Sequence, residues 1–153
     1  MNFTPRKSAS PTDSNVMSFP SVEDCMARNE ITLSPEMTIV DAIDVILINK
    51  LTGAPVMDSD RKIVGMLTEK DCLRLLIDSA YNNMPYHNRT VEDYMSKVVK
   101  SVSVDSDILD VANEFLTTTY RKFPVITGDG YLVGQISRRD VLRTVRDLKK
   151  TTW

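Results

Sequence analysis

The sequence predicts an α/β (α+β) protein built from two β-α-β-β-α units that pack with pseudo-twofold symmetry. Three observations support this. The stretch "KIVGMLTEKD" at 62–71 returns as "YLVGQISRRD" at 131–140, and residues 22–76 align with 91–145 without a gap. Sixteen of the 54 residue pairs between 22–75 and 91–144 are identical, which is more than chance provides. Each copy also alternates helical and strand-like apolar patterns.

Each unit begins with a short helix and an extended segment. Ser21 precedes "VEDCM" and Thr90 precedes "VEDYM", each with an aspartate three residues later, as at a helix start. The segments "ITLSP" and "KSVSV" follow and are predicted to be extended. A longer helix then opens at Thr38 and at Asp107.

Two short strands and a final helix complete each unit. The apolar runs "APVMD" and "KIVGML" are separated by a turn, as are "FPVIT" and "YLVGQI". The last helix is predicted to run from Thr68 to about Ser79 and from Ser137 to Leu148.

The expected organisation is a flexible N-terminal tail (1–20), two repeats (21–80 and 90–148) joined by a linker (81–89), and a C-terminal tail (149–153). A unit of about 55 residues buries too little apolar surface to be stable alone. We therefore expect the two units to share one core. The remaining apolar helix faces suit a second copy of the chain and favour a homodimer.

Composition limits the partners and the compartment. The 153 residues carry a net charge of −2, which disfavours nucleic-acid binding. No apolar run reaches the roughly 18 residues that span a bilayer, and the N-terminus lacks a signal-peptide core, so no membrane association is expected. Two cysteines form no disulfide framework. A reduced, cytoplasmic protein is predicted.

Thr68-x-x-Asp71 and Ser137-x-x-Asp140 have two possible roles that do not exclude each other. The pattern is a capping box at a helix start, where the cap contributes about 1 kcal/mol. A helix N-terminus also suits a phosphate group, and the aspartate could accept hydrogen bonds from ribose hydroxyls. A capping box prefers Glu or Gln at the third position, so the shorter Asp in both copies mildly favours the ribose role.

The chain resembles a tandem pair of CBS domains, a Bateman module, over about residues 21–147. The motifs that carry the resemblance are the paired "VEDxM" segments, Pro55-Val56 and Pro124-Val125, and the two "Val-Gly-x-aliphatic-Thr/Ser-x-x-Asp" segments. The resemblance implies a free-standing regulatory module that binds an adenosyl ligand (AMP, ADP, ATP, S-adenosylmethionine or sometimes NAD) between its repeats. It also implies an unknown regulated protein as partner, and no required cofactor.

The resemblance also implies two clefts. One would combine Ser137, Asp140, Arg121 and Lys122 with Ser34, Gly53 and Ala54 of the first repeat. The other would combine Thr68, Asp71, Thr52 and Gly53 with Ser103, Lys122 and Phe123. The first cleft has Arg121, Lys122, Arg138 and Arg139 nearby, where the second has Thr52, Gly53, Glu69 and Lys70. Because Glu69 would oppose a phosphate if it pointed inward, we expect the first cleft to be the better nucleotide site, unless Arg138 and Arg139 form a solvated helix face.

The alternative function is a structural homodimerisation module with empty clefts. An enzyme is not expected, because the sequence has no paired nucleophile and base, metal-ligand cluster or Walker-type loop. The sole histidine, His87, lies in the predicted linker. No catalytic or metal-binding residue is therefore predicted.

Overall fold

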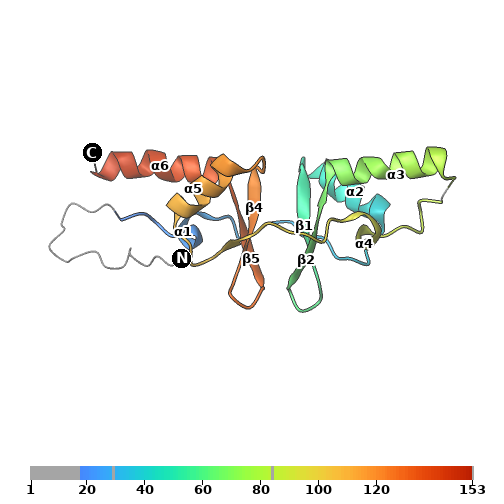
Figure 1. Ribbon diagram of the computed structural model, residues 1–153, viewed down its shortest axis with the longest axis horizontal. Coiled ribbons are helices and arrows are strands. Elements are labelled where there is room, and N and C mark those ends of the chain that lie inside the picture. Colours follow the sequence, from blue (N-terminus) through green and yellow to red (C-terminus); the bar gives the residue numbers. More distant parts are fainter. Residues whose placement is uncertain (1–17, 29, 84, 153) are drawn as a thin grey trace.

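The structure, a computed structural model, describes residues 18–28, 30–83 and 85–152. It contains helices and short strands in two similar halves that lie on either side of a central axis (Figure 1). The order is α1(Val22–Cys25), α2(Ile39–Ile48), β1(Gly53–Met57), β2(Ile63–Thr68), α3(Glu69–Tyr81), α4(Val91–Tyr94), β3(Val102–Ser103), α5(Ile108–Thr117), β4(Lys122–Ile126), β5(Leu132–Ser137) and α6(Arg138–Thr152).

Both final helices are longer than predicted. Helix α3 ends at Tyr81 and α6 at Thr152, so α6 continues into the positions expected to form a C-terminal tail. Most of the expected N-terminal tail, residues 1–17, lies outside the described residues. In the part of the chain that the structure describes, no helix is long and apolar enough to cross a membrane.

The predicted first strand forms in one unit only. In the second unit β3 pairs with β4 in parallel, and the backbone N–H of Val104 extends the ladder to the carbonyl of Ile126 (2.9 Å). In the first unit a single parallel bridge at Leu33 is present instead. The residue equivalent to Val104 is Pro35, which has no N–H to donate, so the ladder cannot continue there.

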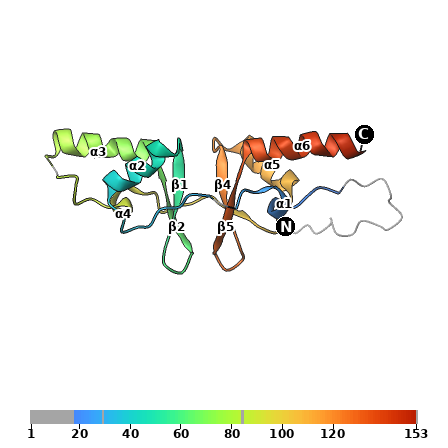
Figure 2. The same cartoon turned by 180° about the vertical axis from the view of Figure 1, so that it is seen from behind.

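The two halves have separate cores, so the prediction of one shared core is wrong. Each core takes its short helix from the other repeat. Val22 of α1 and Met26, which follows it, pack with residues of β4, β5 and α6, whereas Val91 and Tyr94 of α4 pack with residues of α2 and β1. Figures 1 and 2 show α1 on the side of α5 and α6 and α4 on the side of α2 and α3. Neither sequence repeat therefore holds a complete core.

The repeated Val-Gly pair explains how the exchanged segments fit. Ala27, just after α1, exchanges two backbone hydrogen bonds with Gln135 of β5 (2.8 and 3.0 Å), and Ser96 does the same with Met66 of β2 (both 2.9 Å). The neighbouring glycine, Gly134 or Gly65, leaves room for this contact. A Cβ atom on Gly134 would lie 2.6 Å from the carbonyl oxygen of Ala27.

We expect Gly134→Ala to destabilise the protein by about 1–3 kcal/mol, the usual cost of overpacking, because a backbone oxygen cannot move aside as a flexible side chain can. Urea denaturation measures this change. Gly128→Ala is the matched control, because a Cβ atom there would meet nothing within 4 Å. Equal stability of the two variants would contradict the role given to Gly134.

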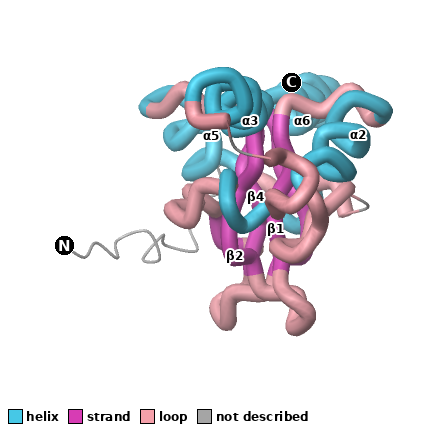
Figure 3. The backbone as a smooth tube through the Cα atoms, turned by 90° about the vertical axis from the view of Figure 1, so that its right-hand side faces the viewer, coloured by secondary structure: helices cyan, strands magenta, loops and turns pink. Residues whose placement is uncertain are grey.

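The two β-hairpins also meet, at the end of the molecule opposite α3 and α6 (Figure 3). Leu132 donates its N–H to the carbonyl of Arg61 (3.0 Å), and the Lys62 ammonium lies 5.4 Å from the centre of the Tyr131 ring. The halves are thus joined at the hairpin tips and through the segments that follow α1 and α4.

Candidate functional site

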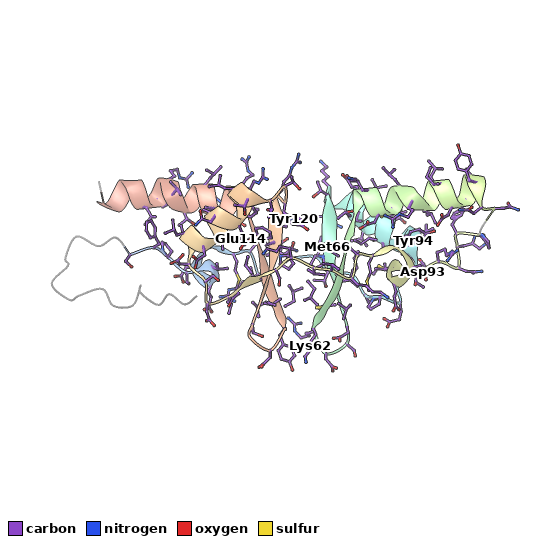
Figure 4. All side chains as sticks on the ribbon, in the orientation of Figure 1. Lys62, Met66, Asp93, Tyr94, Glu114 and Tyr120 are labelled. Carbon is purple, nitrogen blue, oxygen red and sulfur yellow. The ribbon has the colours of Figure 1, made fainter. Side chains whose placement is uncertain are left out.

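A hollow of about 420 Å³ lies between the two repeats and is called the Thr68 hollow here. This volume falls within the range of roughly 300–1,000 Å³ typical of small-molecule sites. Its lining comes from residues 52–53, 66, 68–71, 96, 98–100, 119–122 and 135. Two of these residues, Met66 and Tyr120, lie beside the midline between the halves (Figure 4). Because both repeats contribute, the hollow exists only when they are packed together.

Asp71 is held in a fixed position at the start of α3. Its Oδ2 atom accepts hydrogen bonds from the backbone N–H of Thr68 (2.9 Å) and from the Thr68 hydroxyl (3.0 Å). The N–H of Asp71 donates in turn to the Thr68 hydroxyl, which completes a capping box. Within the described residues, the contact of the Oδ1 atom is a distant one, 3.9 Å to the guanidinium of Arg74. Asp71 therefore caps the helix with one oxygen and keeps the other available for a ligand.

Cationic and apolar groups share this hollow. Lys70 and Arg121 line it and form no ion pair with any residue in the described ranges. Lys100 pairs with Glu114 at 3.0 Å. Met66, Val98, Val99 and the Tyr120 ring supply apolar surface. Such a combination suits a ligand with a flat apolar part and an anionic part.

A second hollow, called the Ser137 hollow, is lined by Ala27, Glu30, Lys122, Gln135, Ser137, Asp140 and Arg143. Ser137 and Asp140 repeat the capping contacts: Oδ2 of Asp140 accepts from the backbone N–H of Ser137 (2.8 Å), and the Ser137 hydroxyl accepts from the N–H of Asp140 (3.1 Å). The difference lies at Oδ1, which accepts from the guanidinium of Arg143 at 2.6 Å. Both oxygens of Asp140 are therefore engaged.

The structure brings most of the predicted residues to the two hollows. Thr52, Gly53, Thr68, Asp71, Arg121 and Lys122 line the Thr68 hollow, and Lys122, Ser137 and Asp140 line the Ser137 hollow. Two predicted residues are in the core instead, because Ala54 is 1% exposed and Phe123 is fully buried. Neither hollow includes Ser34 or Ser103.

The charge difference predicted between the clefts is not what the structure shows. Arg121, assigned with Ser137, lies beside Thr68 and Asp71. Arg138 turns away to donate from Nε to the carbonyl of Tyr120 (3.0 Å), with its guanidinium over the Phe115 ring. Arg121 thus lies in the Thr68 hollow, together with Lys70 and the carboxylates of Glu69 and Asp71.

Sequence reasoning missed the segment 96–100 and its equivalent around Ala27 and Glu30, which contribute to the two hollows. These residues follow the "VEDxM" motifs directly, so the repeat marks their place. Their contribution depends on the exchange of α1 and α4, which the repeat alone does not reveal.

The cysteines next to these sites are poor nucleophiles. Burial, with smaller contributions from the carboxylates of Asp71 and Glu69, raises the pKa of Cys72 to about 11. Burial also raises the pKa of Cys25, against a smaller lowering effect of its hydrogen bond with Thr144. Both thiols are therefore protonated at neutral pH, and neither provides a reactive thiolate.

Comparison with known proteins identifies relatives of similar fold. The model of the CBS domain matches residues 22–78 and 91–147. The chain is 29% identical over 122 residues to the protein MJ1225 of Methanocaldococcus jannaschii, covering 80% of this chain and 41% of that one. It is 28% identical over 142 residues to the chloroplastic CBS domain-containing protein CBSX1 of Arabidopsis thaliana. This match covers 78% of this chain and 60% of that one.

Among solved structures, the crystal structure of CBSX2 in complex with AMP superimposes with a TM-score of 0.75 at 28% identity. The match covers 85% of this chain and 98% of that one. The predicted α+β fold of two packed repeats is thereby confirmed. Since the two family matches together span more than half of the sequence, this chain belongs to the CBS-domain family and carries two CBS domains in tandem.

Proposed function

We propose that this chain is a regulatory module that binds AMP, or a related adenosyl ligand, in the Thr68 hollow and transmits this binding to a partner protein. The observation that carries the proposal is the meeting of the Asp71 carboxylate with the cations of Lys70 and Arg121 in a hollow between the two repeats. The AMP complex of the similar protein CBSX2 supports the same ligand class.

Each part of the ligand has a suitable neighbour in this hollow. The apolar surface around Met66 and Val98 suits an adenine ring, and Oδ1 of Asp71 suits the ribose hydroxyls. The side chains of Lys70 and Arg121 suit a phosphate, because an ammonium and a guanidinium both favour an anion. We expect neither a metal ion nor a required cofactor.

Regulation follows from the position of the hollow between the repeats. A ligand that contacts both α3 and the segment 119–122 stabilises the arrangement of the halves in which both contacts form. It shifts the population of arrangements only to the extent of its different affinity for them. A partner that contacts both halves would then respond to the ligand.

The proposal is tested by a thermal-shift screen with AMP, ADP, ATP, NAD and S-adenosylmethionine. A ligand that binds only the native state stabilises it by about 2.7 kcal/mol at a hundredfold excess over its Kd. At about 2–4 °C per kcal/mol, this gives a rise of roughly 5–10 °C in Tm. Guanosine monophosphate is the control for a general effect of phosphate. A Tm that no adenosyl ligand raises would contradict the proposal.

A structural homodimerisation module is the second candidate function. Helices α3 and α6 lie along one edge of the molecule (Figure 1) and expose Leu73, Leu76, Leu142 and Val145, each at least half exposed. The duplication makes Leu73 equivalent to Leu142 and Leu76 to Val145, so both halves present apolar side chains along this edge. Sedimentation analysis with and without AMP separates a sensor, whose assembly responds to the ligand, from a scaffold, whose assembly does not.

The cytoplasmic location stays a prediction.

A further inference from the structure

Two side chains belong to both hollows. Lys122, at the start of β4, and Gln135, in the middle of β5, line the Thr68 hollow and the Ser137 hollow alike. Both contact the same atom, Oε1 of Glu30. The Lys122 ammonium lies 3.6 Å from it, and the Gln135 amide donates to it at 3.3 Å. Gln135 is 3% exposed, so its amide holds the Glu30 carboxylate in a fixed place.

The charges of the Ser137 hollow are consequently already paired. Glu30 neutralises Lys122, and Asp140 neutralises Arg143. A phosphate group that entered this hollow would have to separate these ion pairs and remain close to the Glu30 carboxylate. Like charges brought together in a sheltered site repel each other.

The Thr68 hollow has no acid at the equivalent position. Val99 is the residue of the second repeat that is equivalent to Glu30. It lines the Thr68 hollow with an apolar side chain. Lys70 and Arg121 therefore face no carboxylate from this segment, although Glu69 at the start of α3 also lines the hollow. This exchange is one of the charge differences between the two hollows, which share the Thr/Ser-x-x-Asp motifs.

We propose that Glu30 determines which hollow accepts a nucleotide: its carboxylate excludes a phosphate from the Ser137 hollow, so that the chain binds one AMP, in the Thr68 hollow. This inference rests on the proposed function. Lys122 also couples the two sites. A phosphate in the Thr68 hollow attracts Lys122, leaves Glu30 less neutralised, and disfavours a second phosphate further.

Isothermal titration with AMP tests this inference on the full chain. We expect about one AMP for each wild-type chain. Glu30→Gln removes the charge but keeps an oxygen that accepts from Gln135, and it should raise the stoichiometry to about two. In an Asp71→Ala background, which weakens the Thr68 site, Glu30→Gln should tighten the remaining AMP binding by about tenfold or more, the value of one charge-assisted contact.

Two controls isolate the charge. Val99→Glu places a carboxylate at the equivalent position of the Thr68 hollow and should weaken AMP binding there by about tenfold. Adenosine lacks the phosphate, so its affinity should be the same for Glu30→Gln and for the wild type. The melting temperature of each variant establishes that it is folded.

The outcomes are distinguishable. Two equal AMP sites in the wild type, or one site in both the wild type and Glu30→Gln, would overturn this inference and leave the proposed function standing. An equal gain in adenosine affinity would show that Glu30 acts by blocking space and would overturn the charge argument. If neither the wild type nor Glu30→Gln bound AMP or any adenosyl ligand, both proposals would fall.

Discussion

Asp71→Ala should weaken AMP binding about a hundredfold or more, since each hydrogen bond between a carboxylate and a ribose hydroxyl is worth about 1.5–3 kcal/mol. Asp71 is 15% exposed and lines the Thr68 hollow, with Oδ1 free of any close contact in the described residues. Isothermal titration with AMP measures the loss.

The same substitution also removes a helix cap, which costs about 1 kcal/mol of stability. Asp93→Ala is the matched control for this effect. Asp93 accepts from the backbone N–H of Thr90 (2.9 Å) at the start of α4, is exposed, and lies away from the midline (Figure 4). It should lose a similar stability and keep its AMP affinity. If both variants lost affinity equally, the effect would come from folding, and Asp71 would have no ligand role.

The internal repeat made the fold predictable. The alignment of 22–76 with 91–145 identified both units, and the Thr/Ser-x-x-Asp motifs located the starts of α3 and α6 at the hollows. These features are local, because a helix cap and a short strand depend on residues close together in the sequence.

The arrangement between the repeats was not predictable in the same way. The exchange of α1 and α4 joins residues about 100 positions apart, as in the contact of Gln135 with Glu30, and no local pattern indicates it. The absent strand at Leu33 has a local cause, because Pro35 has no N–H to extend the ladder. The resemblance to CBS domains predicts Phe123 in a cleft. However, side chains alternate along a strand, and Phe123 points into the core while Lys122 points to the hollows.

Phe123→Ala should lower the free energy of unfolding by about 3–5 kcal/mol, the usual cost of removing a buried aromatic side chain. Phe123 is fully buried and stacks on Phe115 with ring centres 4.5 Å apart. The cavity would open between β4 and α5, in the core that α1 completes. Since small domains are stable by only about 5–15 kcal/mol, this loss is a large part of the total. Urea denaturation measures this loss as a lower midpoint concentration, with an unchanged dependence of the unfolding free energy on urea.

Binding separates the two roles that Phe123 could have. Phe123→Leu keeps an apolar side chain, is expected to cost clearly less stability than alanine, and should bind AMP as the wild type does. Tyr120→Ala removes an aromatic ring three positions earlier that is 49% exposed and lines the Thr68 hollow. It should lose AMP affinity with little effect on stability. If Phe123→Leu folds but binds AMP more weakly, Phe123 takes part in the binding site, because a side chain confined to the core does not contact the ligand.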